Sequence, residues 1–427
     1  MGGCIEENTL VLAEDRYYSM DSYKTKLNNN VLVVGTSGAG KTRSIVEPNL
    51  LQATGSYIVS DPKGNLHKKY RRYLAGKGYK VLKLDFTDPE NSAYYNFFKY
   101  IRNTQDIIKV AHMMIYQDKG RKTLDPFWDQ SAQLLLQACI AYLIETAKES
   151  DRNLENVMKL IGMCEIDENN TSKESATDLL FKALEEKSPN SYAAKTYKKY
   201  RCAAGKTLKS ILITINAKLG LFDAPEINEM LRKDTIDIPS IGDRRTALFV
   251  VVSDTDRSLD ALVNIFFSQT MNELCRHADK ECEDNRLPVP TRFILDDFAT
   301  NVRIEEFPRM IASIRSRGIS TMLMIQAESQ LREAYDNDDK TIIGNCDTYI
   351  YLGGNDVETS KAIAERCDVP VKKILNMPVG KNLIFRRGQA PVYSQNIDLD
   401  AFKKAIENIN ERNTNNALQE DRDVVSF

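Results

Sequence analysis

The sequence predicts an α/β fold with a mostly parallel sheet that is interrupted by an all-α insertion. Two observations lead to this prediction. Short apolar runs bounded by turn residues alternate with helix-like stretches up to about residue 104, and strand-like runs resume near residue 246. The chain between these two regions shows helical periodicity with polar breaks. A length of 427 residues leaves room for both parts.

Seven short runs are the strongest strand candidates, because each is apolar or β-branched and has turn residues on both sides. They are Val31–Val34, Tyr57–Ser60, Lys80–Leu84, Ala247–Val252, Phe293–Leu295, Thr321–Ile325 and Thr348–Leu352. Asn382–Phe385 and Pro391–Tyr393 are weaker candidates. Helices are expected after the first two strands, over Thr42–Ala53 and Asn65–Ala75.

The helical block separates two parts of the sheet domain. Its clearest helix is expected over Asp125–Lys148, where apolar residues fall on one stripe, whereas Ile211–Ile215 could be strand or helix. We therefore assign residues 1–104 and 241–412 to the sheet domain and residues 105–240 to an all-α domain. Residues 413–427 are polar and charged, and we expect them to be disordered.

A complete phosphate-binding loop follows the first strand candidate. The pattern G-x-x-x-x-G-K-[ST] is matched by Gly35, Thr36, Ser37, Gly38, Ala39, Gly40, Lys41 and Thr42. Its position between a strand and a helix is the context that the motif requires. The glycines allow backbone N–H groups to face a triphosphate, Lys41 can reach the β- and γ-phosphates, and the Thr42 hydroxyl can bind Mg²⁺. The loop predicts nucleoside triphosphate binding; a glycine-rich turn without a ligand is the alternative.

A second acidic element is expected to complete this site. The strand candidate Phe293–Leu295 is followed directly by Asp296 and Asp297. In phosphate-loop folds the first such carboxylate holds Mg²⁺, usually through water, and the second polarises the attacking water. We assign these roles to Asp296 and Asp297, and a solvated Asp-Asp turn is the alternative. The assignment requires the Asp296 carboxylate to lie within water-bridged reach of the Thr42 hydroxyl.

Further catalytic candidates follow the acidic pair. Gln326 comes directly after the strand candidate Thr321–Ile325, at the edge where ligands bind in open α/β sheets, and it could sense the γ-phosphate through water. Arg315–Gly318 is expected to end a helix. Arg315 or Arg317 could be presented to a neighbouring subunit as an arginine finger. The alternative for both arginines is a favourable interaction with the carboxyl end of their own helix.

The charge balance confines any nucleic-acid contact to local patches. The formal net charge is −2, so the chain as a whole is not a basic nucleic-acid-binding protein. Residues 67–72 and 195–201 mix cations with tyrosines, as expected for neutralising and stacking on single-stranded DNA. The candidate DNA or partner contacts are Lys63, Lys68, Lys69, Arg71, Arg72, Lys195, Lys198, Lys199 and Arg201. Solvated helix faces are the alternative for the two clusters, and partner docking is a further one for residues 195–201. For Lys63 the alternative is a type I or II turn with Pro62 at its second position.

Cysteine usage and hydropathy suggest a cytoplasmic protein. The eight cysteines are scattered without a C-x-x-C pair, so we expect unpaired thiols and no zinc site. The sequence contains no run of eighteen apolar residues, and its first 30 residues lack the apolar core of a signal peptide.

Several motifs, in their order along the chain, resemble those of the type IV secretion system coupling proteins, the TraG/TraD-like ATPases of bacterial conjugation. The segments are Gly35–Thr42, Ser56–Gly64, Phe127–Asp129, Phe293–Phe298, Ile314–Ser320 and Gln326–Leu331. The resemblance spans roughly residues 30 to 395. The Asp-Pro-Lys-Gly turn at residues 61–64 and the Arg-x-x-Gly…Gln segment discriminate better than the phosphate loop, which many families share.

The resemblance implies a RecA-like nucleotide-binding domain interrupted by an all-α domain. It implies ATP and Mg²⁺ as cofactors, bound at the subunit boundaries of a homohexamer with single-stranded DNA in its channel; the chain alone could be a monomer. The implied partners are single-stranded DNA, the relaxase of the relaxosome, and the type IV secretion machinery at the inner membrane. Within this family pattern Arg315, three residues before Gly318, is the better arginine finger, and Gln326 is the sensor.

Three positions or segments depart from the family pattern. The family commonly has Asp-Glu where this chain has Asp296-Asp297, and the shorter side chain would shift the water and slow hydrolysis. Asn65 stands where the family often has glutamate. Relatives usually begin with transmembrane helices, and none is expected here, so a truncated chain and a natural form without the anchor both fit. We therefore expect a protein that is peripheral to the cell membrane through its secretion-system partners.

The expected function is that of a conjugative coupling ATPase, which recruits and translocates single-stranded DNA with its relaxase. A septal-type double-stranded DNA translocase shares the sheet and ring, but it does not predict so long a helical insertion. A non-motor, nucleotide-gated adaptor that docks relaxase or effector proteins is the other alternative. Because Asp297 stands where the family commonly has glutamate, the adaptor hypothesis is retained.

Overall fold

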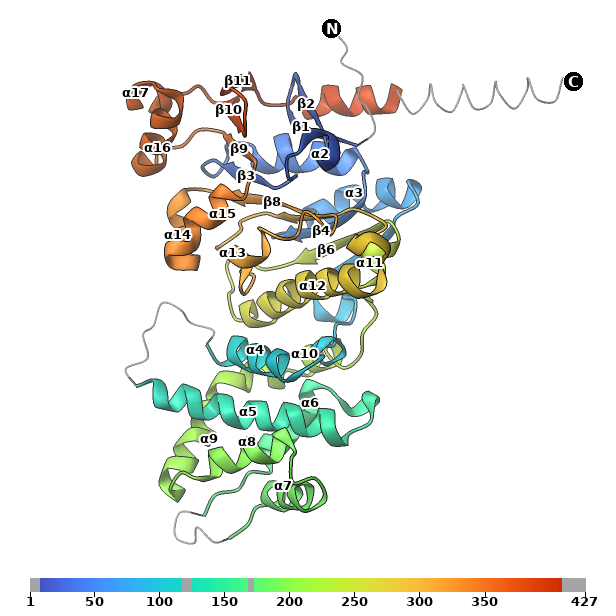
Figure 1. The fold of residues 1–427 in the computed structure, drawn as a ribbon, viewed down its shortest axis with the longest axis vertical. Helices are drawn as coiled ribbons and strands as arrows, with labels where there is room; N and C mark the ends of the chain where they lie inside the picture. Colours follow the sequence, from blue (N-terminus) through green and yellow to red (C-terminus); the bar gives the residue numbers. More distant parts are fainter. Residues whose placement is uncertain (1–7, 117–124, 168–172, 409–427) are drawn as a thin grey trace, which may run out of the picture. The chain divides into compact units, whose positions relative to one another are not determined.

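Nine strands form one sheet in the order β11-β10-β9-β3-β8-β7-β4-β6-β5. The computed structural model describes residues 8–116, 125–167 and 173–408 (Figure 1). The strands are β3 (Val31–Val34), β4 (Ser56–Asp61), β5 (Lys80–Asp85), β6 (Thr246–Val251), β7 (Thr291–Leu295), β8 (Ile319–Ile325), β9 (Thr348–Tyr351), β10 (Lys381–Arg386) and β11 (Val392–Gln395). The ladders from β9 across to β6 are parallel, and β10 pairs antiparallel with β9 and β11. The predicted α/β class with a mostly parallel sheet is confirmed, and all nine strand candidates lie on strands.

The strand order brings distant motifs to one edge of the sheet. Strand β8 lies between β3 and β7, and all three run parallel. Val34 is opposite Ile325 in the β3–β8 ladder, and Leu295 is opposite Leu323 in the β7–β8 ladder. Because carboxyl ends of parallel strands meet at the same edge, the segments that follow β3, β7 and β8 emerge side by side.

The described residues form two compact units, and the first contains most of the sheet. It comprises Met1–Leu82, Pro239–Val252 and Leu274–Phe427 as far as these are described. Its helices are α1 (Ser22–Thr25), α2 (Glu47–Leu51), α3 (Asn65–Gly76), α11 (Ser240–Asp243), α13 (Phe307–Met310), α14 (Glu328–Tyr335), α15 (Asp339–Gly344), α16 (Val357–Cys367) and α17 (Val371–Leu375). Strands β3, β4, β6 and β7 are buried along their whole length, as expected for parallel strands that are covered on both faces.

The second unit is helical and comprises Lys83–Ile238 and Ser253–Glu273 as far as these are described. Its helices are α4 (Thr104–Ile115), α5 (Pro126–Thr146), α6 (Leu154–Gly162), α7 (Ala176–Lys187), α8 (Tyr192–Arg201), α9 (Gly205–Leu219) and α10 (Pro225–Met230). Helix α5 packs against α4, α6, α8 and α9. The ambiguous segment Ile211–Ile215 lies within α9. Helix α12 (Asp260–Glu281) has its first part in this unit, whereas residues 241–412 were all assigned to the sheet domain.

Local structure differs from the sequence prediction at three places. An antiparallel hairpin of β1 (Thr9–Ala13) and β2 (Arg16–Ser19) was not predicted. The helix expected over Thr42–Ala53 begins with a π-helical turn, Thr42–Val46, before α2. Residues 311–318 form turns rather than the end of a helix, because several of their N–H groups bond to the carbonyl three residues earlier.

No helix among the described residues combines the length and the apolar character needed to cross a membrane.

Candidate nucleotide-binding site

The loop after β3 has the backbone shape that its glycines permit. Gly38 and Gly40 adopt φ angles of 78° and 91°, which side chains with a Cβ atom rarely adopt. A Cβ atom at Gly40 would lie 3.0 Å from the Ser44 hydroxyl oxygen, so the loop also needs a small residue there. Thr36, Ser37 and Gly38 are exposed. The loop therefore presents open backbone at the carboxyl edge of the sheet, where an anion can approach.

Lys41 is folded back onto its own loop. Its side chain is 8% exposed, and its Nζ donates to the carbonyl oxygens of Gly35 at 2.6 Å and Thr36 at 3.3 Å. Burial lowers the pKa of the Lys41 ammonium, and the nearby carboxylates of Asp297 and Asp296 oppose this shift. A phosphate group would give this ammonium a charged partner in place of two neutral carbonyl oxygens.

The Thr42 hydroxyl and the Asp296 carboxylate are in direct contact. Thr42 Oγ1 donates a hydrogen bond of 2.7 Å to Asp296 Oδ2, across 254 residues of sequence. Asp296 is only 8% exposed; burial raises its pKa, while the Thr42 hydrogen bond and the Lys41 charge lower it. The Asp296 carboxylate therefore lies within water-bridged reach of the Thr42 hydroxyl, as the sequence-based assignment requires. A hydroxyl and a carboxylate oxygen this close together are suited to binding Mg²⁺, which takes oxygen ligands and retains several waters.

Asp297 follows Asp296, the candidate metal ligand, and has an unusual backbone conformation. Its φ angle is 52°, and its backbone N–H donates to Asp296 Oδ1 at 3.2 Å. Its carbonyl oxygen accepts from Asn301 N at 3.0 Å, which closes the turn after β7. Aspartate enters this left-handed region more easily than most residues with side chains. The turn thus places the second carboxylate near Lys41, where the water-activating role assigned to it stays a prediction.

Gln326 is exposed at the carboxyl end of β8, between the phosphate loop and the acidic pair. Its backbone N–H donates to the side-chain oxygen of Gln330 at 2.7 Å, and the Gln330 amide donates to Thr300 Oγ1 at 3.0 Å. The Ile325 carbonyl accepts from Gly35 N at 3.1 Å, which joins this edge to the loop. Sequence reasoning missed Gln330 and Thr300, because only the fold brings the Gln326–Leu331 segment next to the turn after β7.

The two arginine-finger candidates are not brought to this site. Both precede β8, so they lie at the amino edge of the sheet, opposite the phosphate loop. Arg315 Nη2 donates to the Ser22 carbonyl oxygen at 2.7 Å. Arg317 binds the Asp279 carboxylate with two hydrogen bonds, of 2.7 and 2.8 Å. Neither arginine can therefore serve the phosphate loop of its own chain, and a role toward a neighbouring chain stays a prediction.

The Asp-Pro-Lys-Gly turn follows β4 at the same edge as the phosphate loop. Asp61 is buried, and its carboxylate accepts from the backbone N–H groups of Leu66 at 3.2 Å and His67 at 2.9 Å. Burial raises the pKa of Asp61, and these backbone donors lower it. Asp61 thus fixes the first turn of α3, a role that sequence reasoning missed although acidic residues are common at helix starts. Lys63 is exposed in the turn.

The basic cluster on α3 is a charged face over a buried tyrosine. Lys68, Arg71 and Arg72 are exposed, and within the described ranges no acidic side chain forms an ion pair with them. Lys69 instead pairs with Glu47, which also accepts from the hydroxyl of Tyr70. Tyr70 is 2% exposed, so the expected stacking of bases on it is wrong.

The basic cluster on α8 is largely neutralised within the helical unit. Lys198 pairs with Glu185 at 3.0 Å and Arg201 with Asp178 at 2.7 Å, while Lys195 bonds to an asparagine. Lys199 is exposed. Tyr197 and Tyr200 are buried, and Tyr197 stacks on Phe181 with ring centroids 4.0 Å apart. Stacking of bases on these tyrosines is therefore also wrong, because they form the apolar stripe of an amphipathic helix.

Known relatives share this sequence over much of its length. Conjugal transfer protein TraG from Escherichia coli is 24% identical over 360 residues, covering 79% of this chain and 54% of TraG. Protein VirD4 from Rhizobium rhizogenes is 25% identical over 349 residues, covering 78% of this chain and 49% of VirD4. The chain thus spans about half the length of these relatives.

Solved structures of the bacterial conjugative coupling protein TrwB share the fold. TrwBdeltaN70 in a trigonal form with sulphate gives a TM-score of 0.64 at 16% identity, covering 92% of this chain and 90% of that one. TrwB in complex with ADP and Mg²⁺ gives a TM-score of 0.60 at 16% identity, covering 86% and 85%. The likeness confirms the predicted RecA-like nucleotide-binding fold.

A family match agrees with these relatives. Residues 4–368 match the family described as Type IV secretory system Conjugative DNA transfer, which is well over half of the chain. With the resemblance seen in its motifs now matched independently, this chain belongs to the type IV secretory system conjugative DNA transfer family, the coupling proteins of conjugation.

Proposed function

We propose that this chain is an ATP-hydrolysing coupling protein that recruits and moves single-stranded DNA, with its relaxase, toward a type IV secretion channel. The observation that carries the proposal is the 2.7 Å contact between Thr42 Oγ1 and Asp296 Oδ2. It unites a glycine-rich anion site with an acidic strand end, which is the arrangement that phosphoryl transfer with a metal ion requires. Membership of the family supplies the setting of conjugation and type IV secretion.

ATP and Mg²⁺ are the proposed cofactors, and TrwB bound to ADP and Mg²⁺ supports this choice. The loop Gly35–Gly40 and the Lys41 ammonium would hold the phosphates, while Thr42 and Asp296 would hold the metal. The metal would neutralise charge on the phosphate oxygens. Asp297 would orient the attacking water, and Gln326, exposed at the same edge, would sense the γ-phosphate.

A ring of subunits is the proposed active form. Arg315 lies at the amino edge of the sheet and cannot reach the loop of its own chain, so a transition-state role requires a second copy. A homohexamer with ATP at the subunit boundaries, as the family pattern implied, meets this need. The ring would act in the cytoplasm, at the membrane through its secretion-system partners.

DNA contact is best assigned to α3. Its exposed cations, Lys68, Arg71 and Arg72, are spaced by three and four residues and therefore share one face. They lack ion-pair partners in the described part of the chain, in contrast to the paired cations Lys198 and Arg201 of α8. Phosphate neutralisation rather than stacking would carry this contact.

One observation favours a second candidate, a nucleotide-gated adaptor that docks its cargo without moving DNA. Asp297 takes the place of the longer glutamate, and its φ of 52° ties the carboxylate to a tight turn. A shorter acid in a fixed position can hold nucleotide and metal while placing the water poorly. Such a protein would bind ATP and respond to it without rapid turnover.

ATP turnover with and without single-stranded DNA separates the two candidates. We expect DNA-stimulated hydrolysis in the unaltered chain. Lys41→Ala should weaken nucleotide binding by 10-fold or more, roughly the loss of one charged contact to phosphate. Asp297→Asn should retain binding and lower turnover by about 100-fold or more. Lys206→Ala is the matched control, because Ala204–Thr207 resembles half a phosphate loop but Lys206 is exposed at the start of α9.

Three outcomes of this experiment are informative. Tight ATP binding without turnover in the unaltered chain would favour the adaptor. Unchanged turnover in both Lys41→Ala and Asp297→Asn would show that the site is wrongly assigned. A loss in Lys206→Ala equal to that in Lys41→Ala would remove the special role of the loop.

A further inference from the structure

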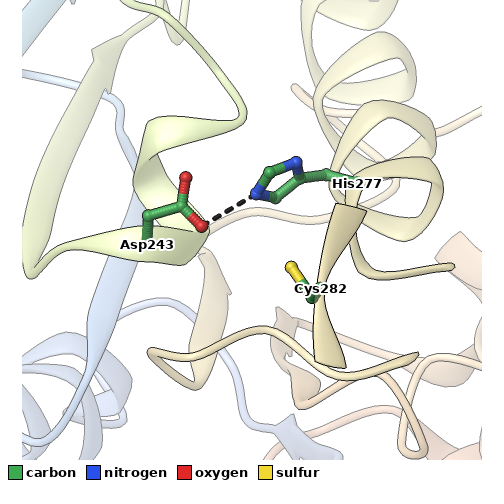
Figure 2. Close-up of side chains that lie close together, drawn as sticks. All are labelled: Asp243, His277 and Cys282. Atoms are coloured by element: carbon green, nitrogen blue, oxygen red, sulfur yellow. Dashed lines mark hydrogen bonds and ion pairs between the residues drawn. The ribbon is translucent and has the colours of Figure 1, made fainter. Parts of the chain in front are cut away.

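A histidine, a cysteine and an aspartate converge away from the nucleotide site. His277 lies near the end of α12, Cys282 directly follows that helix, and Asp243 is the last residue of α11. One potential ligand atom from each residue lies within 4.8 Å of the other two. Figure 2 shows Asp243 and His277 pointing toward each other, with the Cys282 sulfur beside them. Elsewhere in the described ranges, no other group of three such side chains meets this criterion.

We propose that Asp243, His277 and Cys282 bind a divalent cation of the zinc class, with water as the fourth ligand. An imidazole nitrogen, a sulfur and a carboxylate oxygen are the three donor types that zinc takes in proteins. His277 and Cys282 lie close together in the sequence, but 34 residues separate Asp243 from His277, so spacing alone did not indicate a three-ligand site. The proposal runs against the sequence prediction that the chain has no zinc site.

The geometry requires only small movements to become tetrahedral. His277 Nε2 and Asp243 Oδ1 are 2.8 Å apart, the length of a hydrogen bond or ion pair. Zinc–ligand bonds of about 2.0–2.3 Å put the ligand atoms of a tetrahedron roughly 3.3–3.8 Å apart. The N–O pair would therefore open by about 0.5 Å and the sulfur would move inward, which side-chain rotations allow. Asp243, with 47% of its side chain exposed, leaves a path for the ion and for water.

The backbone around the cluster is fixed by contacts that need no metal. The Gly242 carbonyl accepts from Val289 N at 2.8 Å, which ties the end of α11 to the segment after Cys282. A Cβ atom at Gly242 would come within 2.6 Å of Leu287, so the two segments meet closely at this glycine. The Leu287 N–H in turn donates to the Arg317 carbonyl at 3.0 Å. Ligands held on fixed segments lose less entropy when an ion binds.

The neighbouring charges do not supply a simpler role for the thiol. Burial, Asp243 and Glu281 all raise the pKa of the Cys282 thiol. An activated nucleophile or redox-sensing cysteine needs the opposite shift. Glu281 is itself paired with Arg276 at 3.5 Å. An Asp243–His277 ion pair alone would account for two of the three side chains and leave the sulfur unexplained.

The bound ion would brace the amino edge of the sheet. Asp243 lies just before β6, and Cys282 lies on the connection into β7, whose far end carries Asp296. Asp279, two residues from His277, holds Arg317 with two hydrogen bonds. The ion would therefore fix the last turn of α12 and, through Asp279, the segment that carries the arginines.

Cobalt is the probe that tests the proposal, because a thiolate ligand gives Co²⁺ a charge-transfer absorption band. The untagged full chain is treated with a chelator, desalted and titrated with Co²⁺ alone, without nucleotide. We expect the band to saturate at one equivalent, to disappear when Zn²⁺ is added, and to be lost in Cys282→Ser. Cys275→Ser is the matched control, since it removes a thiol of α12 that lies outside the cluster. Co²⁺ at Thr42 and Asp296 would have oxygen ligands and give no such band.

Affinity and stability measurements complete the test. His277→Asn and Asp243→Asn should each weaken Co²⁺ binding by about 10-fold or more while retaining the thiolate band at higher Co²⁺. Zinc should raise the thermal midpoint of the unaltered chain and of Cys275→Ser but not that of Cys282→Ser. If Cys282→Ser does not fold, the Co²⁺ affinities of His277→Asn and Asp243→Asn decide whether the site exists. A missing band in the unaltered chain, a band unchanged in Cys282→Ser, or affinities unchanged in both other variants would overturn the proposal.

Discussion

In the proposed nucleotide site Asp296 binds the metal as a charged carboxylate, but the fold of the free protein does not favour that charge. Burial raises the pKa of its carboxyl group, so in the folded chain the protonated form is favoured relative to the unfolded chain. The resulting loss of stability is absent below the ordinary carboxyl pKa of about 4, grows as the pH rises, and is complete above the folded-state pKa. The hydrogen bond from Thr42, the charge of Lys41 and the hydrogen bond from the Asp297 N–H offset only part of it.

Asp296→Asn should therefore stabilise the free protein and abolish hydrolysis. The asparagine oxygen can still accept from Thr42, and removal of the buried charge outweighs loss of the 3.2 Å bond from the Asp297 N–H. Each kcal/mol gained raises the thermal midpoint by about 2–4 °C in a chain of roughly 150–250 residues, and somewhat less is expected here. The gain should be seen at about pH 8 and vanish near pH 4. Scanning calorimetry at both pH values measures the gain, with the exposed Asp338→Asn as control. A thermal midpoint of Asp296→Asn below that of the unaltered chain at about pH 8 would contradict the prediction.

At the scale of elements, the sequence predicted those strands and loops whose signals lie in a few consecutive residues. The loop after β3, the acidic end of β7 and all nine strands of the large sheet have local signals. The hairpin β1–β2 was missed although Thr9–Ala13 is an apolar run followed by turn residues; in the structure the Asn49 side chain bonds to both the N–H and the carbonyl of Val11, 38 residues away. The tyrosines of α3 and α8 were misassigned although their spacing of three residues, as in Tyr197 and Tyr200, is that of a buried helix stripe.

Helix α3 gives the prediction that belongs to this scale. The triple charge reversal Lys68→Glu, Arg71→Glu and Arg72→Glu should weaken single-stranded DNA binding. It should also reduce the slope of log K against log salt by about 2, at roughly 0.7 for each phosphate that is no longer neutralised. Reversal of Lys195, Lys198 and Lys199 on α8 is the matched control, because Lys198 is already paired. Fluorescence anisotropy at several salt concentrations measures both; a weaker affinity in the α8 variant than in the α3 variant would assign DNA binding to the helical unit.

At the scale of the whole molecule, one chain holds only part of the proposed catalytic machinery. The phosphate loop, Asp296, Asp297 and Gln326 lie at the carboxyl edge of the sheet, and the arginines lie at the amino edge. A closed ring resolves this division, because each site then receives an arginine from the next copy. Catalysis would depend on assembly, and subunits with different defects should repair each other.

Mixing two inactive variants tests this directly. Arg315→Ala retains an intact acidic pair, and Asp297→Asn retains an intact arginine, so boundaries that combine the two intact parts should hydrolyse ATP. With random mixing of equal amounts, about a quarter of the boundaries have this composition.

Arg317→Ala is the control: because Asp279 binds Arg317 within its own chain, its replacement should lower stability without losing turnover in the assembled ring. Arg315→Ala also loses a bond to the Ser22 carbonyl, so its thermal midpoint must be measured alongside. Folded variants that assemble with DNA and stay inactive in every mixture would exclude Arg315 as the arginine supplied to a neighbouring chain.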